Sequence, residues 1–249
     1  MSTSFKIAVV GGFQQGKSTF VNALLERDEA EMGRGLSTTH ENKEYSLSSS
    51  VSLIDTPGFN ANKADDGTAA TAIDKADVVV YVHESKALGN ACPGIFSKIR
   101  KFGKRMVFLL NCCSFDKWSP AENDDIVSTI EAELNDKRIL QAVLPVSGRP
   151  VCPLNVLWAR FGLGMKVDSN DAKKIRIVAE EDLDLSLGDI TGELFRAEML
   201  RRSGFLPVRD FLKNLPLELL KDAATHPERE INRIVNRFAE ELKKRWSAA

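Results

Sequence analysis

Eight residues near the N-terminus constrain the fold more than any other part of the chain. They are Gly11-Gly12-Phe13-Gln14-Gln15-Gly16-Lys17-Ser18, which fit the pattern G-x-x-x-x-G-K-[ST] between an apolar run and a segment of helical spacing. A strand, a glycine-rich turn and a helix in this order predict a phosphate-binding loop. The glycines let backbone N–H groups point inward, and the helix N-terminus favours negative charge.

The chemistry of this loop assigns roles to its side chains. We expect Lys17 to contact the β- and γ-phosphates of a nucleotide, and Ser18 to ligate Mg²⁺ through its hydroxyl. The residues expected to contact the nucleotide are Gly12, Phe13, Gln14, Gln15, Gly16, Lys17, Ser18 and Thr19.

Short runs rich in Val and Ile alternate with segments of helical spacing along the first two thirds of the chain. The predicted buried strands are Lys6–Val10, Val51–Ile54, Val78–Val82, Met106–Leu110 and Val143–Val146. The predicted helices are Ser18–Leu25, Pro93–Phe102, Pro120–Leu134 with Ser119 as its N-cap, and Leu154–Phe161. With Glu44–Leu47 as an antiparallel edge strand, this order predicts an α/β fold. Its six-stranded, mostly parallel sheet would be covered by helices on both faces.

The pattern changes near Gly162, which predicts a division of the 249 residues into three parts. Residues 1–165 are expected to form the core, 166–190 an acidic connecting segment without clear periodicity, and 191–249 a helical C-terminal segment packing on the core. Its predicted helices are Glu193–Arg202, Leu206–Leu220 and Pro227–Trp246. The last helix is amphipathic and carries charges of both signs. We therefore expect it to dock on the core, or to bind a protein partner, rather than to bind a membrane.

Composition excludes several classes of function. Thirty-four basic residues nearly balance 35 acidic ones, so we expect no nucleic-acid partner attracted by a global field. The four cysteines lack the spacing of a zinc site, and we interpret them as reduced core residues. No signal peptide and no run of 18 apolar residues is found, which favours the cytoplasm.

Two further segments have the order expected of a nucleotide-dependent switch. Asp55-Thr56-Pro57-Gly58 follows a predicted strand, so Asp55 can reach Mg²⁺ through water, and Gly58 can offer its N–H to the γ-phosphate. Upstream lies Gly35-Leu36-Ser37-Thr38-Thr39, where a hydroxyl could complete the Mg²⁺ shell only when the γ-phosphate is present. We favour Thr39 over Thr38 for this role.

The order of these elements resembles the five signature elements of GTPases. The stretch Gly11–Leu25 is similar to bacterial dynamin-like GTPases, and so are Leu144–Ser147 and Ser203–Val208. This resemblance to the dynamin-like and translation-factor-related class covers roughly residues 5–222. It implies a P-loop GTPase fold with a short helical C-terminal appendage, and GTP and GDP as ligands.

The resemblance also implies a guanine site, with one departure from the family pattern. Asn111 and the Ser147-Gly148 loop would hold the base. Family members read Asn/Thr-Lys-x-Asp, whereas this chain reads Asn111-Cys112-Cys113-Ser114, and Asp116 comes two positions late. A bulged loop could bring Asp116 to the base. A lost base contact would weaken guanine discrimination by about 1.5–3 kcal/mol per hydrogen bond.

A second departure concerns catalysis. Phe59 follows Gly58, where small Ras-like GTPases have the glutamine that orients water. Dynamin-like relatives use the P-loop instead, often with a monovalent cation (K⁺ or Na⁺), across a dimer formed through the nucleotide face. The resemblance therefore implies Gln14, Lys17 and Thr39 as catalytic residues, with Ser18, Thr39 and Asp55 at the metal. Arg34 is the one candidate for an arginine finger.

Two functions from different classes follow. The first is Mg²⁺-dependent GTP hydrolysis by a nucleotide-dependent switch or assembly GTPase, activated by self-association. The second is a catalytically weak, GTPase-like scaffold that binds nucleotide and works through protein interactions. A small-molecule kinase would share the P-loop but would not account for Asp55–Gly58.

Overall fold

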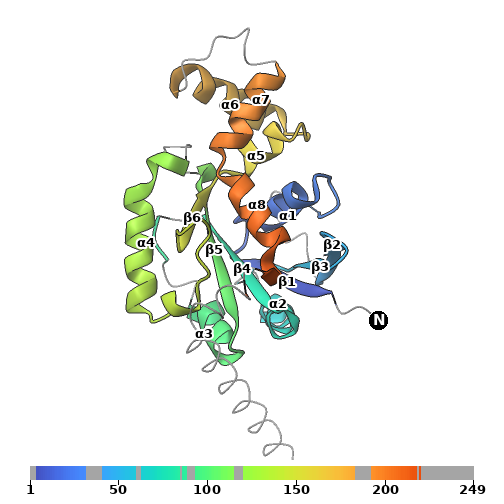
Figure 1. Ribbon diagram of the computed structural model, residues 1–249, viewed down its shortest axis with the longest axis vertical. Helices are drawn as coiled ribbons and strands as arrows, with labels where there is room; N and C mark the ends of the chain where they lie inside the picture. Colours follow the sequence, from blue (N-terminus) through green and yellow to red (C-terminus); the bar gives the residue numbers. More distant parts are fainter. Residues whose placement is uncertain are drawn as a thin grey trace, which may run out of the picture.

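A computed structural model describes residues 4–31, 41–59, 63–84, 86–88, 93–114, 120–182, 192–217 and 219. Within these ranges six strands form one sheet in the order β2-β3-β1-β4-β5-β6 (Figure 1). The strands are β1 (Phe5–Gly11), β2 (Lys43–Ser46), β3 (Val51–Asp55), β4 (Val78–His83), β5 (Arg105–Asn111) and β6 (Val151–Leu154). Only β2 pairs antiparallel in these ranges, with β3. The expected mostly parallel sheet with an antiparallel edge is confirmed.

The register of the parallel strands places their carboxyl ends at one edge of the sheet. Val9 of β1 pairs with Asp55 of β3, and Gly11 pairs with Val82 of β4. On the other side, Asn111 at the end of β5 pairs with Leu154 of β6. The residues that follow β1, β3 and β5 therefore meet at the same edge, where ligands bind in open α/β sheets.

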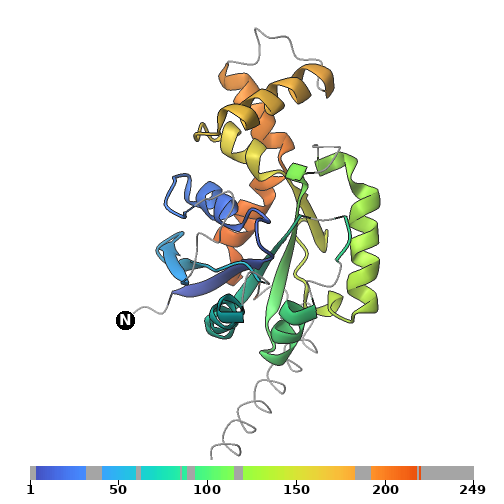
Figure 2. The same cartoon turned by 180° about the vertical axis from the view of Figure 1, so that it is seen from behind.

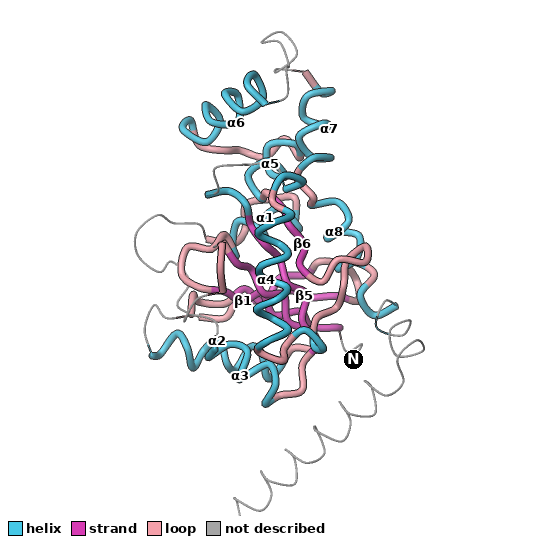
Figure 3. Tube along the Cα trace, turned by 90° about the vertical axis from the view of Figure 1, so that its left-hand side faces the viewer, coloured by secondary structure: helices cyan, strands magenta, loops and turns pink. Residues whose placement is uncertain are grey.

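Helices cover both faces of the sheet, as the continuous apolar strands require. On one face lie α2 (Lys63–Lys75), α3 (Pro93–Lys101) and α4 (Asp124–Asp136). Figure 3 shows α4 running in front of the strands. On the other lie α1 (Lys17–Leu25), the first turns of α5 (Val156–Gly162) and α8 (Phe205–Lys213). Neighbours along β1 point to opposite faces. Ala8 and Val10 join the apolar cluster under α2, α3 and α4, which we call the first core cluster. Ile7 and Val9 join the cluster under α1, α5 and α8, the second core cluster.

A smaller group of helices extends past the sheet at the upper end of Figures 1 and 2. It consists of α5, α6 (Ser169–Asp182) and α7 (Glu193–Arg202), and we call these three helices the helical lobe. Trp158, Ile175, Phe195 and Met199 form a third apolar cluster inside it. Each of the three helices contributes to this cluster, so the lobe has a small core of its own.

The sixth strand lies later in the chain than the sequence predicts. Val143–Val146 is not a strand, and Val143 makes only an isolated bridge to Met106. Ser147 (φ 50°) and Gly148 (φ 80°) then form a tight turn, closed by hydrogen bonds of 3.0 Å in both directions between Val146 and Arg149. The strand begins only after this turn, at Val151.

Several helix boundaries also differ from expectation. The helix expected from Pro120 starts as a short 3₁₀ helix (Pro120–Glu122), and α4 begins at Asp124 with Asn123 at its N-cap position, so the Ser119 cap is wrong. The helix expected from Leu154 begins at Val156, capped by Asn155, and the one expected over Leu206–Leu220 is α8. Glu193–Arg202 is confirmed as α7.

Two helices were not expected. The region 164–190 lacks periodicity in sequence, yet α6 occupies Ser169–Asp182, with the Asp168 carboxylate accepting the Asp171 N–H at 2.8 Å. Helix α2 was also missed. The predicted helix Pro227–Trp246 lies outside the described residues. Among the described helices, none has the length and hydropathy needed to cross a bilayer.

Candidate nucleotide site

The predicted phosphate loop connects β1 to α1 with a backbone that curls tightly. Gln14 (φ 58°) and Gly16 (φ 86°) both adopt the left-handed conformation. A Cβ added to Gly11 would lie 2.3 Å from the Val82 carbonyl oxygen, and one on Gly16 would lie 2.7 Å from Asn111 Nδ2. Glycine is therefore required at both positions. Gly16 is the N-cap of α1 and offers no side chain, so the first N–H groups of α1 remain available to an anion.

Lys17 lies across this loop. Its side chain is buried, and Nζ donates to the Gly12 carbonyl oxygen at 2.8 Å rather than to a carboxylate. Burial lowers the pKa of Lys17 to about 8, while the charge of Asp55 opposes the shift. An ammonium group that loses hydration without gaining a carboxylate partner favours the approach of an anionic ligand.

Ser18 and Asp55 come together at the carboxyl ends of β1 and β3. The Ser18 hydroxyl donates to Asp55 Oδ2 at 2.9 Å, and the other oxygen, Oδ1, is buried with no hydrogen-bond partner among the described residues. Burial raises the pKa of Asp55 to about 6, and the Ser18 hydrogen bond opposes the shift. A hydroxyl beside an unpartnered carboxylate oxygen fits the preference of Mg²⁺ for hard oxygen ligands. Thr38 and Thr39 lie outside the described residues.

The segment Asp55-Thr56-Pro57-Gly58 rests directly against the phosphate loop. The Thr56 hydroxyl donates to the Val9 carbonyl oxygen at 2.8 Å, and Phe59 N donates to the Gly11 carbonyl oxygen at 3.0 Å. A Cβ on Gly58 would lie 2.7 Å from Phe13 Cα, so only glycine allows this approach. Phe59 is buried in the first core cluster, which leaves it no role in orienting water.

Asn111 joins the end of β5 to the phosphate loop. Its Nδ2 donates to the Gln15 carbonyl oxygen at 3.3 Å, and its Oδ1 accepts from Val156 N at 3.4 Å and from the Cys113 thiol at 2.9 Å. The Ser147-Gly148 turn is exposed. Asp116 lies outside the described residues, so the structure does not place it.

The cysteines beside Asn111 do not replace the missing signature residues. Cys112 is buried in the first core cluster, and burial raises the pKa of its thiol to about 12. Cys112, Cys113 and Cys152 are free thiols. Cys92 lies outside the described residues.

Of the remaining residues of the phosphate loop, Gln15 points into the loop, whereas Phe13 and Gln14 face its outer surface. Gln15 turns inward, and its Oε1 accepts the Gly12 N–H at 2.5 Å. Gln14 is exposed, and Phe13 keeps 38% of its surface accessible. The outer surface of the loop therefore presents an amide and an aromatic ring.

Comparison with known proteins agrees with this geometry. A family model described as "50S ribosome-binding GTPase" matches residues 6–112, which include the phosphate loop, Asp55–Gly58 and Asn111. The chain has the α/β fold of a P-loop GTPase. It is 30% identical over 116 residues to the tRNA modification GTPase MnmE of Campylobacter curvus, a match that covers 43% of this chain and 26% of that protein. The chain thus spans about a quarter of the length of this curated relative.

Among solved structures, the GTPase domain is similar to Era. Era from Aquifex aeolicus bound to GDP and aluminium fluoride is 18% identical, with a TM-score of 0.48 over 72% of this chain and 56% of that one. Another Era structure, with MgGDPNP and a segment of 16S ribosomal RNA, is 15% identical, with a TM-score of 0.48 over 72% of this chain and 57% of that one. The expectation of no nucleic-acid partner gains no support from these similarities.

Proposed function

We propose that this chain binds and hydrolyses Mg²⁺·GTP as a nucleotide-dependent switch or assembly GTPase of the dynamin-like type. The observation that carries the proposal is the pairing of Ser18 with Asp55 beside Lys17. A buried ammonium and a buried carboxylate, one oxygen of which has no hydrogen-bond partner among the described residues, lie beside a loop whose N–H groups can donate to phosphate.

Each residue of the site has a defined task in this proposal. The N–H groups from Gly12 to Thr19 hold the phosphates, once the Gly12 N–H leaves Gln15 Oε1, and Lys17 exchanges the Gly12 carbonyl for phosphate oxygens. Ser18 would hold the metal ion through its hydroxyl, and Asp55 would help to hold it through water. When bound, Mg²⁺ supplies positive charge to the β- and γ-phosphate oxygens. The N–H of Gly58 and the hydroxyl of Thr39 report whether the γ-phosphate is present.

The attacking water needs an orienting group, and Phe59 is buried away from it. We assign this task to Gln14, whose exposed amide lies on the outer surface of the loop, together with a monovalent cation, K⁺ or Na⁺. The exposed ring of Phe13 beside it supports a second copy as the partner, because a nucleotide-face dimer would cover both side chains.

Base recognition is assigned to Asn111, Asp116, Ser147 and Gly148. Asn111 already joins β5 to the phosphate loop, which supports a role in holding this side of the nucleotide. Asp116 would supply the carboxylate that accepts from guanine. The predicted helix Pro227–Trp246 remains a candidate docking or partner surface, and a cytoplasmic location remains a prediction.

A second candidate function is a nucleotide-binding scaffold with weak turnover. It is favoured by the stretch Asn111-Cys112-Cys113-Ser114, in which a buried cysteine stands where relatives carry a lysine. In that case partner binding, rather than hydrolysis, would be the output of the nucleotide state.

Phosphate release by the purified chain distinguishes the two functions. We expect Mg²⁺-dependent GTP hydrolysis that rises faster than linearly with protein concentration, is faster in KCl or NaCl than in a tetramethylammonium salt, and is lost in Lys17→Ala. Lys213→Ala is the matched control, because this exposed lysine on α8 is remote in sequence from the loop. Tight nucleotide binding without turnover would establish the scaffold instead. In a competitive titration, tighter binding of ATP than of GTP would overturn the guanine assignment.

A further inference from the structure

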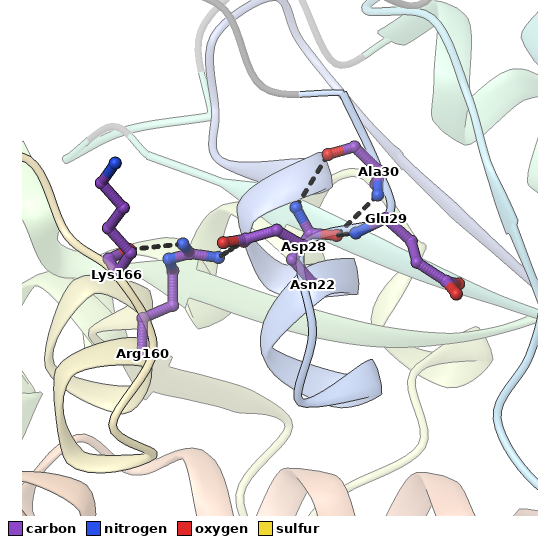
Figure 4. Close-up of polar contacts among 6 residues, drawn as sticks. All are labelled: Asn22, Asp28, Glu29, Ala30, Arg160 and Lys166. Atoms are coloured by element: carbon purple, nitrogen blue, oxygen red, sulfur yellow. Dashed lines mark hydrogen bonds and ion pairs between the residues drawn. The ribbon is translucent and has the colours of Figure 1, made fainter.

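The loop that follows α1 is held by a buried polar side chain of that helix. Asn22 is fully buried; its Nδ2 donates to the Ala30 carbonyl oxygen at 2.8 Å, and its Oδ1 accepts the N–H groups of Glu29 and Ala30 at 3.0 and 2.7 Å (Figure 4). The loop Asp28–Glu31 is thereby attached to the helix that begins at Lys17.

The same loop is also attached to the helical lobe. Arg160 of α5 is 3% exposed, and its Nη1 donates to Asp28 Oδ1 at 2.7 Å. Its Nη2 donates to the Lys166 carbonyl oxygen at 2.6 Å, in the connection between α5 and α6 (Figure 4). A planar guanidinium that donates to two different segments fixes the relative position of those segments more tightly than a single point charge would.

Helix α5 contacts the nucleotide site at its other end. Val156 N donates to Asn111 Oδ1 at 3.4 Å, and Asn111 in turn donates to the phosphate loop. In the middle of α5, Trp158 belongs to the cluster formed with α6 and α7. One short helix thus touches the phosphate loop through Asn111, the lobe core through Trp158, and the loop after α1 through Arg160.

A further contact joins the loop Asp28–Glu31 to the start of β2. Residues 32–40 lie outside the described residues, but their flanks are joined, because Lys43 Nζ pairs with Glu31 Oε1 at 2.5 Å. Along the sequence, this loop leads to Thr38-Thr39, to which the proposed function assigns the response to the γ-phosphate.

We propose that Arg160 is a positioning residue that couples the helical lobe to the response of the site to the γ-phosphate. The inference rests on the proposed function, because it assumes that the Thr38-Thr39 segment distinguishes GTP from GDP. A partner that shifts the lobe would move Asp28 through Arg160, and nucleotide exchange would alter the lobe by the reverse route, since coupling free energies are reciprocal.

Substitution at the exposed end of the ion pair tests the inference with little risk to folding. Asp28→Asn keeps the shape of the side chain and removes its charge. We expect it to weaken the affinity for Mg²⁺·GTPγS about 2- to 30-fold, the range for residues that act through a second element, with Mg²⁺·GDP affinity unchanged within twofold. Arg160→Lys, which keeps the charge but lacks the two-pronged geometry, is expected to fall between Asp28→Asn and the wild type.

The matched control is Glu26→Gln in the same connection. Glu26 pairs with Arg209 at 3.4 Å, but Arg209 belongs to α8 rather than to the lobe, so both affinities should stay within twofold. In the wild type and in Glu26→Gln, replacing GDP by GTPγS should change hydrogen exchange at the amides of 166–175. In Asp28→Asn it should not.

Identical behaviour of Asp28→Asn and Glu26→Gln would overturn the inference. So would an equal loss of both affinities in Asp28→Asn with a lowered Tm, which would mark the pair as a stability contact only. A wild-type chain that binds neither nucleotide would overturn the proposed function as well.

Discussion

At Lys17 and Asp55, burial in the fold disfavours the charged form that ligand binding needs. Burial lowers the pKa of Lys17 to about 8 and raises that of Asp55 to about 6, so both groups are charged at pH 7 at the expense of their hydration. The contribution of Asp55 to stability is present below its unfolded pKa and is lost as the pH rises through about 6. That of Lys17 is present above its unfolded pKa and is lost as the pH falls through about 8. A bound triphosphate would compensate the buried positive charge of Lys17, and its metal ion would compensate the buried negative charge of Asp55.

The raised pKa of Asp55 predicts a pH dependence of metal binding. Protonated Asp55 no longer supplies the negative charge that would hold Mg²⁺ through water, so we expect the Mg²⁺ affinity of the GDP-bound chain to fall about tenfold per pH unit below about 6. Titration calorimetry at pH 7.5, 6 and 5 measures this fall. Asp55→Asn is the control, because the pH dependence that remains in it belongs to the nucleotide. An affinity that stays flat in the wild type would contradict the assignment of Asp55.

At the scale of elements, the helical lobe depends on a close approach between α5 and α7. A Cβ on Gly162, the last residue of α5, would lie 2.5 Å from Leu200 Cβ and 2.7 Å from the Arg196 carbonyl oxygen. The other end of α5 is capped by Asn155, whose Oδ1 accepts the N–H groups of Leu157 and Trp158 at 3.1 Å. Both ends of this short helix are therefore determined by specific residues.

Alanine substitution of two helical glycines is expected to have opposite effects. Gly162→Ala should destabilise the chain by about 1–3 kcal/mol, because the added methyl group overlaps the backbone of α7. Gly67→Ala in α2, where a Cβ meets nothing within 4 Å, should stabilise it by about 0.4–1 kcal/mol. Urea denaturation measures both values, and a stabilising Gly162→Ala would show that α7 does not lie this close to α5.

At the scale of the whole molecule, the chain returns to the second core cluster after forming the lobe. Helix α8 packs on the sheet beside α1, and the ring of Phe205 meets Phe20 edge-on at a centroid distance of 6.1 Å. Val208 and Leu212 are buried in the same cluster. Residues that follow the lobe in sequence thus complete the core under the phosphate-loop helix.

This arrangement predicts how the chain tolerates shortening. A chain that ends at residue 165 would lose α8 and expose Phe20, so we expect it to aggregate or to show no cooperative unfolding. Phe205→Ala in the full chain should cost about 3–5 kcal/mol for the same reason. A chain that ends at residue 220 keeps all of the described core and should unfold cooperatively. Cooperative unfolding of the 1–165 chain, followed by circular dichroism, would establish that residues 1–165 fold alone.

Local patterns in the sequence determined much of this protein. The glycines and lysine of Gly11–Ser18, the apolar runs that became β1 and β3–β5, and Asp55 all follow from neighbours along the chain. Motif spacing also predicted that Ser18 and Asp55 would hold one metal ion, and the Ser18 hydroxyl lies 2.9 Å from Asp55 Oδ2. The roles of these residues toward a nucleotide stay predictions until ligands are tested.

Tertiary structure decided the rest, because the deciding contacts join residues far apart in sequence. Val143–Val146 has the composition of a strand, but Pro153 and its neighbours occupy the edge beside β5, where the missing N–H of proline is tolerated. Helix α6 shows no periodic pattern, and among its residues with a described side chain only Ile175 joins the small lobe core. The pairing of Arg160 with Asp28 spans 132 positions. No local pattern encodes that pairing, because only the packing of α5 against α1 brings the two side chains together.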